Sequence, residues 1–312
     1  MKKISFIGAG SMAREHIRAF KARPDAELAG IYSRTKSRAE ALAQEFGIPL
    51  VCDSVADLAR RTEATLVVVA VPELALNAVA KSAFVEPWSV LLEKPAGYSF
   101  ADAQDIESAA RGRASPVMVG FNRRFYASTM KLKASLDAYD GARFVHLQDQ
   151  QSYAEARRYN HPEPVVENFM YANSIHVIDL ARHLCRGPIV AVNRIMPWRG
   201  EATEVVLTHL AFESGDAALY EGIWRGPGPW SCSVSTAQRR WTMQPLERLS
   251  FQNANERTQN AVEPDPIDAS FKAGFARQAE AVLARANGRP SAAVSIAESL
   301  QTMEVIREIF GV

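Results

Sequence analysis

The first thirteen residues constrain the fold most, because they predict a strand that runs directly into a glycine turn and a helix. Residues 4–7 form a short apolar run with β-branched members, and G-x-G-x-x-A follows it at Gly8, Gly10 and Ala13. In such a turn the first glycine permits a tight bend, the second lets the backbone approach a pyrophosphate, and the third small residue lets helix and strand pack closely. The free N–H groups and positive dipole of a helix N-terminus then favour phosphate.

The residues that follow support this interpretation over a glycine turn that binds nothing. Residues 14–22 carry Ile17 and Phe20 at helical spacing, and residues 27–32 form a second strand. This completes a βαβ unit of about thirty residues, the expected length. The pattern therefore predicts a dinucleotide site that includes Gly8, Gly10, Ser11, Met12 and Ala13.

The composition is that of an ordinary soluble globular protein, and its length predicts two domains. The chain has 312 residues, of which 47% are apolar and 23% charged, and its formal net charge is +1. Such a charge creates no overall field that would draw the protein to nucleic acid or to a membrane. No apolar run has the length needed to span a bilayer, and Met1-Lys2-Lys3 begins a strand rather than an export signal.

Cysteine usage favours a reducing compartment. Cys52, Cys185 and Cys232 are odd in number and lack metal-type spacing. They are predicted to be reduced, mostly buried thiols in a cytoplasmic protein, and no metal site is expected.

Up to about residue 120, strand-like runs alternate with helical patterns, which is typical of a parallel sheet covered on both faces. Residues 65–71 are nearly all Val and Leu, as expected of a central strand, and residues 90–92 and 117–119 form further strands. Ser54 and Ser99 each begin an S-x-x-D capping box. Residues 1–120 are therefore predicted to form a Rossmann-type dinucleotide-binding domain.

After about residue 120 the pattern changes to a series of strands with mostly short connections. The expected strands are residues 142–150, 189–198, 203–212, 217–224, 230–236 and 240–246. One long helix, 166–185, is expected after the first of these strands, and a final amphipathic helix from Ser295. Residues 121–312 are therefore predicted to form an α+β domain with a large, mostly antiparallel, open-faced sheet, used for substrate binding and oligomerisation.

Four local patterns stand in a recognisable order along the chain. They are the glycine turn, Glu93-Lys94-Pro95, the sequence GFNRRF at residues 120–125 and the sequence IHVID at residues 175–179. Together they resemble the Gfo/Idh/MocA family of oxidoreductases, which act mostly on sugars, inositols and sugar derivatives with a nicotinamide cofactor. The resemblance implies hydride transfer between that cofactor and a ring carbon, and a homodimer or homotetramer that buries the open sheet face.

The resemblance gives the catalytic roles to Lys94 and His176. Lys94 ends a parallel strand, where such sheets hold ligands, and its ammonium can stabilise a developing alkoxide. His176 can exchange a proton with a secondary alcohol. The family usually has an aspartate four residues before this histidine, whereas this chain has Ala172. The neighbouring Asn173 or Tyr171 could substitute for it, but an amide cannot act as a base.

The end of the second strand favours NADP(H), with NAD(H) as the alternative. NAD sites place an acidic side chain there for the ribose 2′-OH, whereas NADP sites need cationic and hydroxyl donors. Ser33, Arg34 and Arg38 occur here, with no carboxylate before Glu40. A solvated basic helix start is the other interpretation, but cations are unfavourable at a helix N-terminus unless an anion is present. The predicted cofactor contacts also include Val71, Pro72, Glu93, Lys94 and Asn122.

The predicted substrate contacts lie in the second domain. Residues 153–164 hold Tyr153, Arg157 and Arg158, whose cations could bind a carboxylate or a phosphate; a solvated loop is an equal alternative. Asn173 and Arg124 complete the predicted substrate-binding set.

Two other functions remain open on the sequence alone. One is a glycosidase that oxidises and re-reduces its substrate with tightly held NAD. The other is a non-catalytic nucleotide-binding or sensor protein, which Ala172 makes conceivable and the presence of Lys94 and His176 disfavours.

Overall fold

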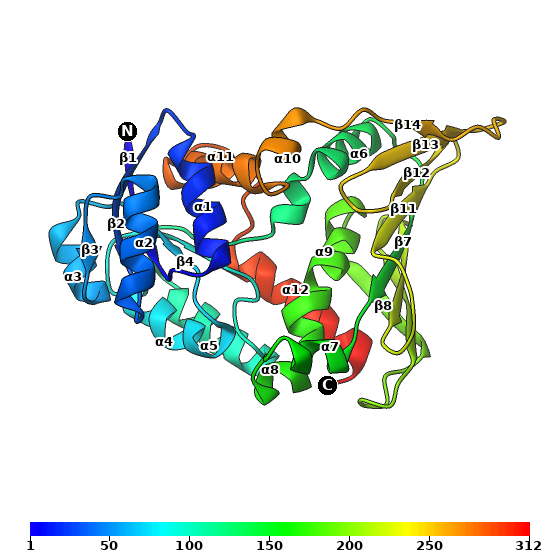
Figure 1. Cartoon of the computed structure of the whole chain (residues 1–312). Coiled ribbons are helices and arrows are strands. Elements are labelled where there is room, and N and C mark those ends of the chain that lie inside the picture. The colour runs from blue at the N-terminus through cyan, green and yellow to red at the C-terminus, as the bar shows by residue number, and fades with distance from the viewer. The chain divides into compact units, whose positions relative to one another are not determined.

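A computed structural model describes residues 1–312, and the chain divides into two compact units (Figure 1). Unit 1 consists of Met1–Asn122 and Ala269–Gln301, and unit 2 of Arg123–Asp268 and Thr302–Val312. The predicted boundary at residue 120 falls beside Asn122. Residues 269–301 were predicted to belong with the second domain, but they lie in unit 1, where Phe275 and Val282 enter its core.

Unit 1 contains a parallel six-stranded sheet, sheet A, in the order β3-β2-β1-β4-β5-β6. All four side chains of the central strand β4 are buried, as expected for a strand covered on both faces. The strands are β1 (Lys2–Ile7), β2 (Ala26–Tyr32), β3 (Val51–Cys52), β4 (Leu66–Val69), β5 (Ser89–Leu92) and β6 (Val117–Val119). The predicted parallel Rossmann-type sheet is therefore confirmed.

The helices of unit 1 begin where local signals predict. The side chain of Ser54 accepts from the backbone N–H of Asp57, and that of Ser99 accepts from Asp102. The helices are α1 (Ser11–Lys21), α2 (Lys36–Phe46), α3 (Val55–Arg61), α4 (Glu73–Phe84), α5 (Phe100–Ala110) and α11 (Phe275–Ala286).

Unit 2 contains an eight-stranded sheet, sheet B, in the order β14-β13-β12-β11-β7-β10-β9-β8. All neighbouring pairs are antiparallel except β7 and β10. The strands are β7 (Phe144–Gln150), β8 (Ile189–Met196), β9 (Val205–Phe212), β10 (Ala217–Ile223), β11 (Ser231–Ser235), β12 (Arg239–Met243), β13 (Leu249–Asn253) and β14 (Asn260–Ala261). Alternate residues of β9 and β10 are buried and half-buried, so one face of the sheet is covered and the other is open.

The single long helix predicted for residues 166–185 is interrupted in the structure. α8 (Glu163–Glu167) is followed by a π-helical turn, η2 (Met170–Ser174), and then by α9 (Ile175–Leu184). The remaining helices are η1 (Asn122–Phe125), α6 (Ala127–Asp137), α7 (Tyr153–Arg158), α10 (Pro266–Ser270) and α12 (Ile296–Phe310). The last of these begins at the predicted cap, because Ser295 and Glu298 exchange side-chain and backbone hydrogen bonds.

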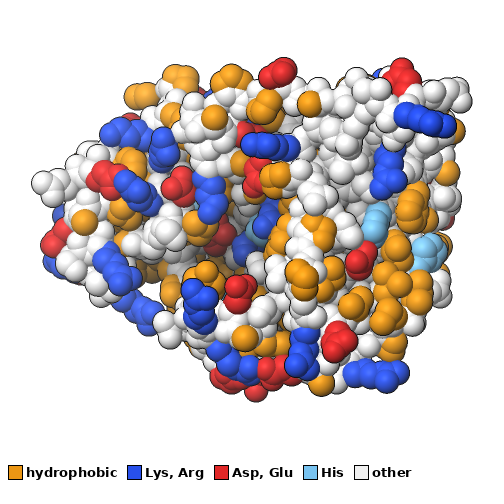
Figure 2. Space-filling view, turned by 45° about the vertical axis from the view of Figure 1, so that its right-hand side comes forward, with side chains coloured by type: hydrophobic (Ala, Val, Ile, Leu, Met, Phe, Trp, Pro, Cys, Tyr) orange, Lys and Arg blue, Asp and Glu red, His pale blue; other side chains and the backbone are white.

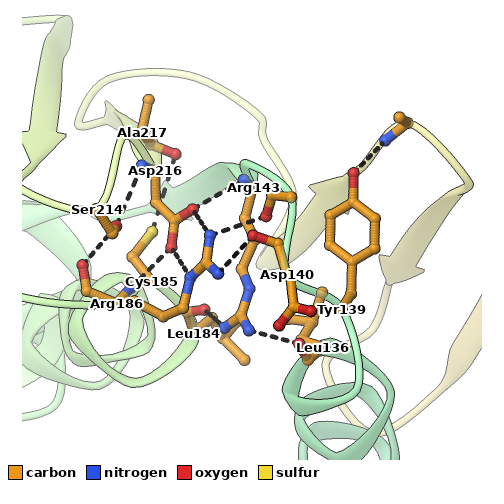
Figure 3. A network of polar contacts seen from close by, with 12 residues as sticks. Leu136, Tyr139, Asp140, Arg143, Leu184, Cys185, Arg186, Ser214, Asp216 and Ala217 are labelled. Atoms are coloured by element: carbon orange, nitrogen blue, oxygen red, sulfur yellow. Dashed lines mark hydrogen bonds and ion pairs between the residues drawn. The ribbon is translucent and has the colours of Figure 1, made fainter.

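A buried carboxylate holds the starts of β7 and β10 to the end of α9 (Figure 3). Asp216 accepts from the backbone N–H groups of Arg143 and Arg186, at 2.9 Å each. The guanidinium of Arg186 also binds both carboxylate oxygens, at 2.7 and 3.0 Å. Burial alone would raise the pKa of Asp216, but the Arg186 side chain and the two N–H groups outweigh it, so the pKa is lowered.

No helix in the structure combines the length and apolarity needed to cross a membrane. Cys52, Cys185 and Cys232 are free and buried, as predicted.

Replacing Asp216 with Asn should lower the free energy of unfolding at pH 7 by about 2 kcal/mol, because the Arg186 guanidinium and two N–H groups lose an anionic acceptor. Because folding lowers the pKa of Asp216, its contribution is present above the unfolded-state pKa of about 3.9 and is lost as the pH falls through the folded-state pKa. Urea unfolding of wild type from pH 7 to 2 should show this acid-dependent loss, and the Asn variant should lack that part of it. The control Asp53→Asn, which breaks the exposed pair with Lys36, should change little.

Candidate functional site

Unit 1 has a cavity of about 370 Å³ at the carboxyl ends of its central strands. It is lined by the glycine turn, by the residues after β2 and β4, and by the turn after β5. Most of the predicted cofactor contacts lie here: Gly8, Gly10, Ser11, Met12, Ser33, Arg34, Arg38, Val71, Pro72, Glu93 and Lys94. Ligands bind to sheets of this kind outside the carboxyl ends of the strands.

The two glycines of the turn meet different requirements. Gly8 has φ +110°, and a Cβ there would lie 2.0 Å from the carbonyl oxygen of Ala70, so only glycine fits. A Cβ on Gly10 would meet no atom within 4 Å, because it would project into open space. Gly10 is the N-cap of α1; no side chain makes a capping hydrogen bond there, and no acidic residue lies in the first turn of that helix. The second glycine thus leaves room for a phosphate at an uncapped helix N-terminus, which fits a dinucleotide.

Some of the cations around this cavity have an anionic partner in the protein, and others do not. Arg14 forms an ion pair with Glu45, and Lys36 forms one with Asp53. Arg34 and Arg38 both line the cavity, and neither forms a side-chain hydrogen bond or ion pair in the structure. α2 also has no acidic residue in its first turn. Two arginines therefore converge, without an anion, on a helix N-terminus that favours one.

The turn after β5 carries Lys94 and is tied to α1. Lys94 is half-buried at the cavity wall, and its peptide bond to Pro95 is cis. The carboxylate of Glu93 accepts from the backbone N–H of Lys94 and lies 2.6 Å from Nε2 of His16. The His16 ring is almost fully buried and packs 4.8 Å from the ring of Phe275. A buried side-chain contact therefore links α1 to the Lys94 turn.

Two predicted cofactor residues lie away from the cavity lining. Ala13 is buried on the inner face of α1, where its small size serves packing. Asn122 is buried and donates to the carbonyl oxygen of Ala273. The structure therefore gives both residues roles in packing and hydrogen bonding within unit 1.

In unit 2 the π-helical turn divides the predicted long helix, so that residues of IHVID and the neighbouring Asn173 lie in two different segments. Asn173 lies in η2, whereas His176 and Asp179 lie in α9. His176 and Ala172 are buried, and Asn173 is half-buried. π-helical turns occur frequently at functional sites.

Asp179 and Arg124 form a buried bidentate ion pair. Nε and Nη2 of Arg124 lie 2.6 and 2.7 Å from the two oxygens of Asp179, and the hydroxyl of Thr302 lies 3.0 Å from one of them. Burial would raise the pKa of Asp179, but the charge and hydrogen bonds of Arg124 lower it overall. Most of the Arg124 fork, which was predicted to bind substrate, is therefore occupied by Asp179.

The predicted substrate residues of α7 also have partners within unit 2. Tyr153 packs 5.0 Å from the ring of Trp224, and burial raises its pKa. Arg157 is held by Glu163 and Glu201, whereas Arg158 is exposed and has only the ring of Tyr159 beneath it. Tyr153 also lines a second cavity of about 680 Å³, while the two arginines do not.

The sequence did not predict a series of buried hydrogen bonds that ends at Asn173 in η2. Asp149 is fully buried, and it accepts from the hydroxyl of Tyr220 and from Gln151, which in turn accepts from Asn173. Burial raises the pKa of Asp149, because the desolvation of its carboxylate outweighs the hydrogen bonds and the positive charge of Arg123, which lower the pKa. The available signal was a carboxylate that follows Val145 and Leu147 on the core-facing positions of a strand.

His16 was also missed, although it lies three residues after Ala13 and four before Phe20, on the buried stripe of α1.

Comparison with known proteins identifies the first part of this chain. Residues 2–121 match the family model described as "Oxidoreductase family, NAD-binding Rossmann fold", GFO_IDH_MocA. Residues 2–121 are therefore similar to the NAD-binding Rossmann domain of the Gfo/Idh/MocA oxidoreductases. This finding agrees with the strand order, the glycine turn and the cavity of unit 1.

Several relatives of this family resemble the chain over part of its length. The glucose-6-phosphate 3-dehydrogenase of Bacillus subtilis is 32% identical over 134 residues, which are 43% of this chain and 37% of that protein. The inositol 2-dehydrogenase of Gluconacetobacter diazotrophicus is 29% identical over 218 residues, 66% of this chain and 60% of that protein. The chain thus matches less than two thirds of either relative.

The solved structures extend the similarity in fold to both units. A dehydrogenase from Chromobacterium violaceum superimposes with a TM-score of 0.83 at 20% identity, over 99% of this chain and 94% of the other. The pairing of a Rossmann-type sheet with a large, mostly antiparallel sheet is therefore the fold of known dehydrogenases.

Substitutions at the two glycines should separate folding from cofactor binding. Gly10→Ala should leave the melting temperature nearly unchanged, because its Cβ enters empty space, but should weaken NADPH binding by roughly tenfold or more, because the methyl group occupies the phosphate position. Gly8→Ala should lower the melting temperature, because its Cβ clashes with Ala70. Thermal melts and NADPH fluorescence titrations measure both effects. Unchanged NADPH affinity in a folded Gly10→Ala protein would contradict this assignment.

Proposed function

We propose that the protein is an NADP(H)-preferring oxidoreductase that moves a hydride to or from a ring CH–OH carbon of a sugar, an inositol or a sugar derivative. The observation that carries this proposal is the cavity of unit 1, where an uncapped helix N-terminus, two unpaired arginines and Lys94 line one space. The inositol and glucose-6-phosphate dehydrogenases named above support the substrate class.

The residues of unit 1 would hold the cofactor in distinct ways. The N-terminus of α1 and the Gly10 turn accommodate the pyrophosphate, while Ser33, Arg34 and Arg38 offer donors to a ribose 2′-phosphate. When bound, the nicotinamide ring supplies the hydride acceptor or donor.

The chain supplies the proton chemistry. The Lys94 ammonium donates a hydrogen bond to the reacting substrate oxygen and stabilises negative charge that develops on it. His176 takes the hydroxyl proton during oxidation and returns it during reduction. With Ala172 at the position where the family usually has an aspartate, no carboxylate from that position assists either residue.

NADPH should bind at least several-fold more tightly than NADH in fluorescence titrations, because Arg34 and Arg38 have no anionic partner within the protein. Arg34→Ala and Arg38→Ala should each weaken NADPH binding and leave NADH binding nearly unchanged. Ser33→Asp should reverse the preference, because a carboxylate accepts from a 2′-OH and repels a 2′-phosphate.

The matched control is Lys36→Ala, which removes a nearby cation that Asp53 already neutralises, and its cofactor preference should resemble that of wild type. Equal affinities of the wild-type protein for NADPH and NADH would defeat the cofactor proposal.

Lys94→Ala should abolish turnover with little change in NADP(H) affinity, because the ammonium acts on the substrate oxygen. His176→Ala should reduce the rate by roughly two to four orders of magnitude, the usual contribution of a positioned acid–base group. The substrate should first be found by screening sugars, inositols, sugar acids and nucleotide sugars with NADP⁺ and NADPH.

Ala172→Asp distinguishes two reasons for the missing carboxylate. If its absence weakens the enzyme, activity toward simple polyols should rise; if the alanine makes room for an anionic substrate, KM for that substrate should rise.

The controls for Lys94→Ala and His176→Ala are Lys81→Ala and His209→Ala, which change partly exposed residues of the same types. Full activity in both Lys94→Ala and His176→Ala would remove the catalytic assignment.

We also expect assembly through the open face of sheet B, and a cytoplasmic location that the three buried free thiols support. Val190, Ile195 and Met196 of β8 are exposed, and hydrophobic side chains gather at the right of the molecule in Figure 2. Light scattering should show a dimer or a tetramer, and Ile195→Glu should shift it toward smaller species. Val85→Glu, at an exposed position of unit 1, is the control, and a wild-type monomer at micromolar concentration would contradict this proposal.

A further inference from the structure

We propose that Asp149 fixes the orientation of the Asn173 amide through Gln151, so that the carbonyl oxygen Oδ1 of Asn173 is presented to a hydroxyl group of the substrate. Only the identity of the ligand rests on the proposed function. The orientation itself follows from a hydrogen-bond chain within unit 2.

The chain has three links. The hydroxyl of Tyr220 donates to Oδ2 of Asp149 at 2.9 Å, and Nε2 of Gln151 donates to Oδ1 of Asp149 at 2.5 Å. Nδ2 of Asn173 then donates to Oε1 of Gln151 at 2.8 Å. Asp149 and Tyr220 stand on the parallel strands β7 and β10, so the sheet itself holds the start of the chain.

The direction of the chain is set by its carboxylate end. A carboxylate oxygen only accepts, so Gln151 must turn its NH₂ group toward Asp149 and its carbonyl toward Asn173. Asn173 must therefore use its NH₂ group for Gln151. A proton on the oxygen that faces Tyr220 would leave this direction unchanged, because the other oxygen of Asp149 would still accept.

Burial makes this orientation costly to reverse. Asp149 and Tyr220 are fully buried and Gln151 is 2% exposed, so water cannot replace a misdirected hydrogen bond. Asn173 is half-buried; its Oδ1 accepts no hydrogen bond from the protein and is not among the buried unpaired atoms. The free end of the chain is therefore a solvent-accessible carbonyl oxygen.

This end selects a class of ligand. A fixed carbonyl oxygen accepts from the O–H group of a neutral polyol, and its lone pairs repel a carboxylate or a phosphate oxygen. Asn173 therefore favours a sugar or inositol hydroxyl over an anionic substituent at this position. This differs from the anion-binding role expected for the neighbouring arginines of α7.

The test reverses the chain with isosteric substitutions. Asn173→Asp cannot donate to Gln151, so the Gln151 amide must flip and bring its Oε1 against Asp149. In the double variant Asp149→Asn/Asn173→Asp, the new amide at position 149 accepts from Tyr220 and donates to Gln151, and Gln151 donates to the new carboxylate at position 173. All three hydrogen bonds are then restored, and the two that involve Gln151 run in the opposite direction, while Tyr220 still donates to position 149.

Thermal melts of the protein without cofactor or substrate measure the coupling. Relative to wild type, Asn173→Asp should lower the melting temperature by roughly 3 °C or more. Relative to the Asp149→Asn variant, adding Asn173→Asp should lower it by less than half as much. Asn193→Asp, an exposed substitution in the same unit, should change little in either background. Equal losses in both backgrounds would overturn the proposed orientation, whether or not the protein is a dehydrogenase.

The ligand class is tested separately by saturation-transfer NMR, with myo-inositol and D-gluconate competing for the NADP⁺-loaded protein. Wild type should saturate myo-inositol more strongly, and Asn173→Ala should lose that signal. Stronger saturation of gluconate, or saturation of neither compound, would overturn the role of Oδ1 in recognition while leaving the measured coupling intact.

Discussion

The close approach of the Gly8 backbone to Ala70 is the constraint on which the cavity of unit 1 depends. Because β1 and β4 are neighbours in sheet A, the chain can turn from β1 into α1 at this point only if residue 8 has no side chain. The turn leaves the N-terminus of α1 at the carboxyl ends of the central strands. An anion would therefore be recognised there mainly by backbone N–H groups and the helix dipole, which the fold itself positions.

The same end of the sheet receives the turn that carries Lys94. The contact between His16 and Glu93 joins α1 to this turn, and His16 is held from the other side by Phe275 of α11. Residues 269–301 thus belong to unit 1 for a physical reason, since α11 packs on α1 and supports a side chain close to the cavity wall. The glycine turn, α1 and the Lys94 turn of unit 1 are therefore supported by one packed core.

Local sequence patterns predicted most of this fold, because they depend on interactions between residues that are close in sequence. The serine caps at Ser54 and Ser99 and the glycine turn after β1 depend on neighbours in the chain, and the structure contains them. The π-helical turn at residues 170–174 was not predicted, because no glycine or proline marks it. At this turn Asn173 bonds to Gln151, twenty-two residues away along the chain, and a local pattern cannot report such a contact.

The same distinction applies to the candidate site. The glycine turn, Ser33 and the arginines after β2 are close in sequence, and they line one cavity as expected. The charged residues Arg124 and Arg157 were expected to face a ligand, but their partners come from other elements, Asp179 from α9 and Glu201 from the segment before β9. Whether an arginine is available for binding depends on such distant carboxylates, so sequence position alone does not decide it.

These pairings show what Ala172 removes from the site, because no other carboxylate nearby is available in its place. Both buried carboxylates of this region already have partners. Asp149 accepts hydrogen bonds from Tyr220 and Gln151, and Asp179 pairs with Arg124 and accepts from Thr302. Neither is left to replace an aspartate at position 172, and Asn173 can accept a hydrogen bond but cannot exchange a proton at neutral pH. An alanine that is 5% exposed removes the carboxylate without leaving a buried charge or an unpaired polar group. In the proposed reaction, His176 therefore exchanges the proton without help from a carboxylate at position 172, and Asn173 beside it provides a neutral hydrogen-bond acceptor.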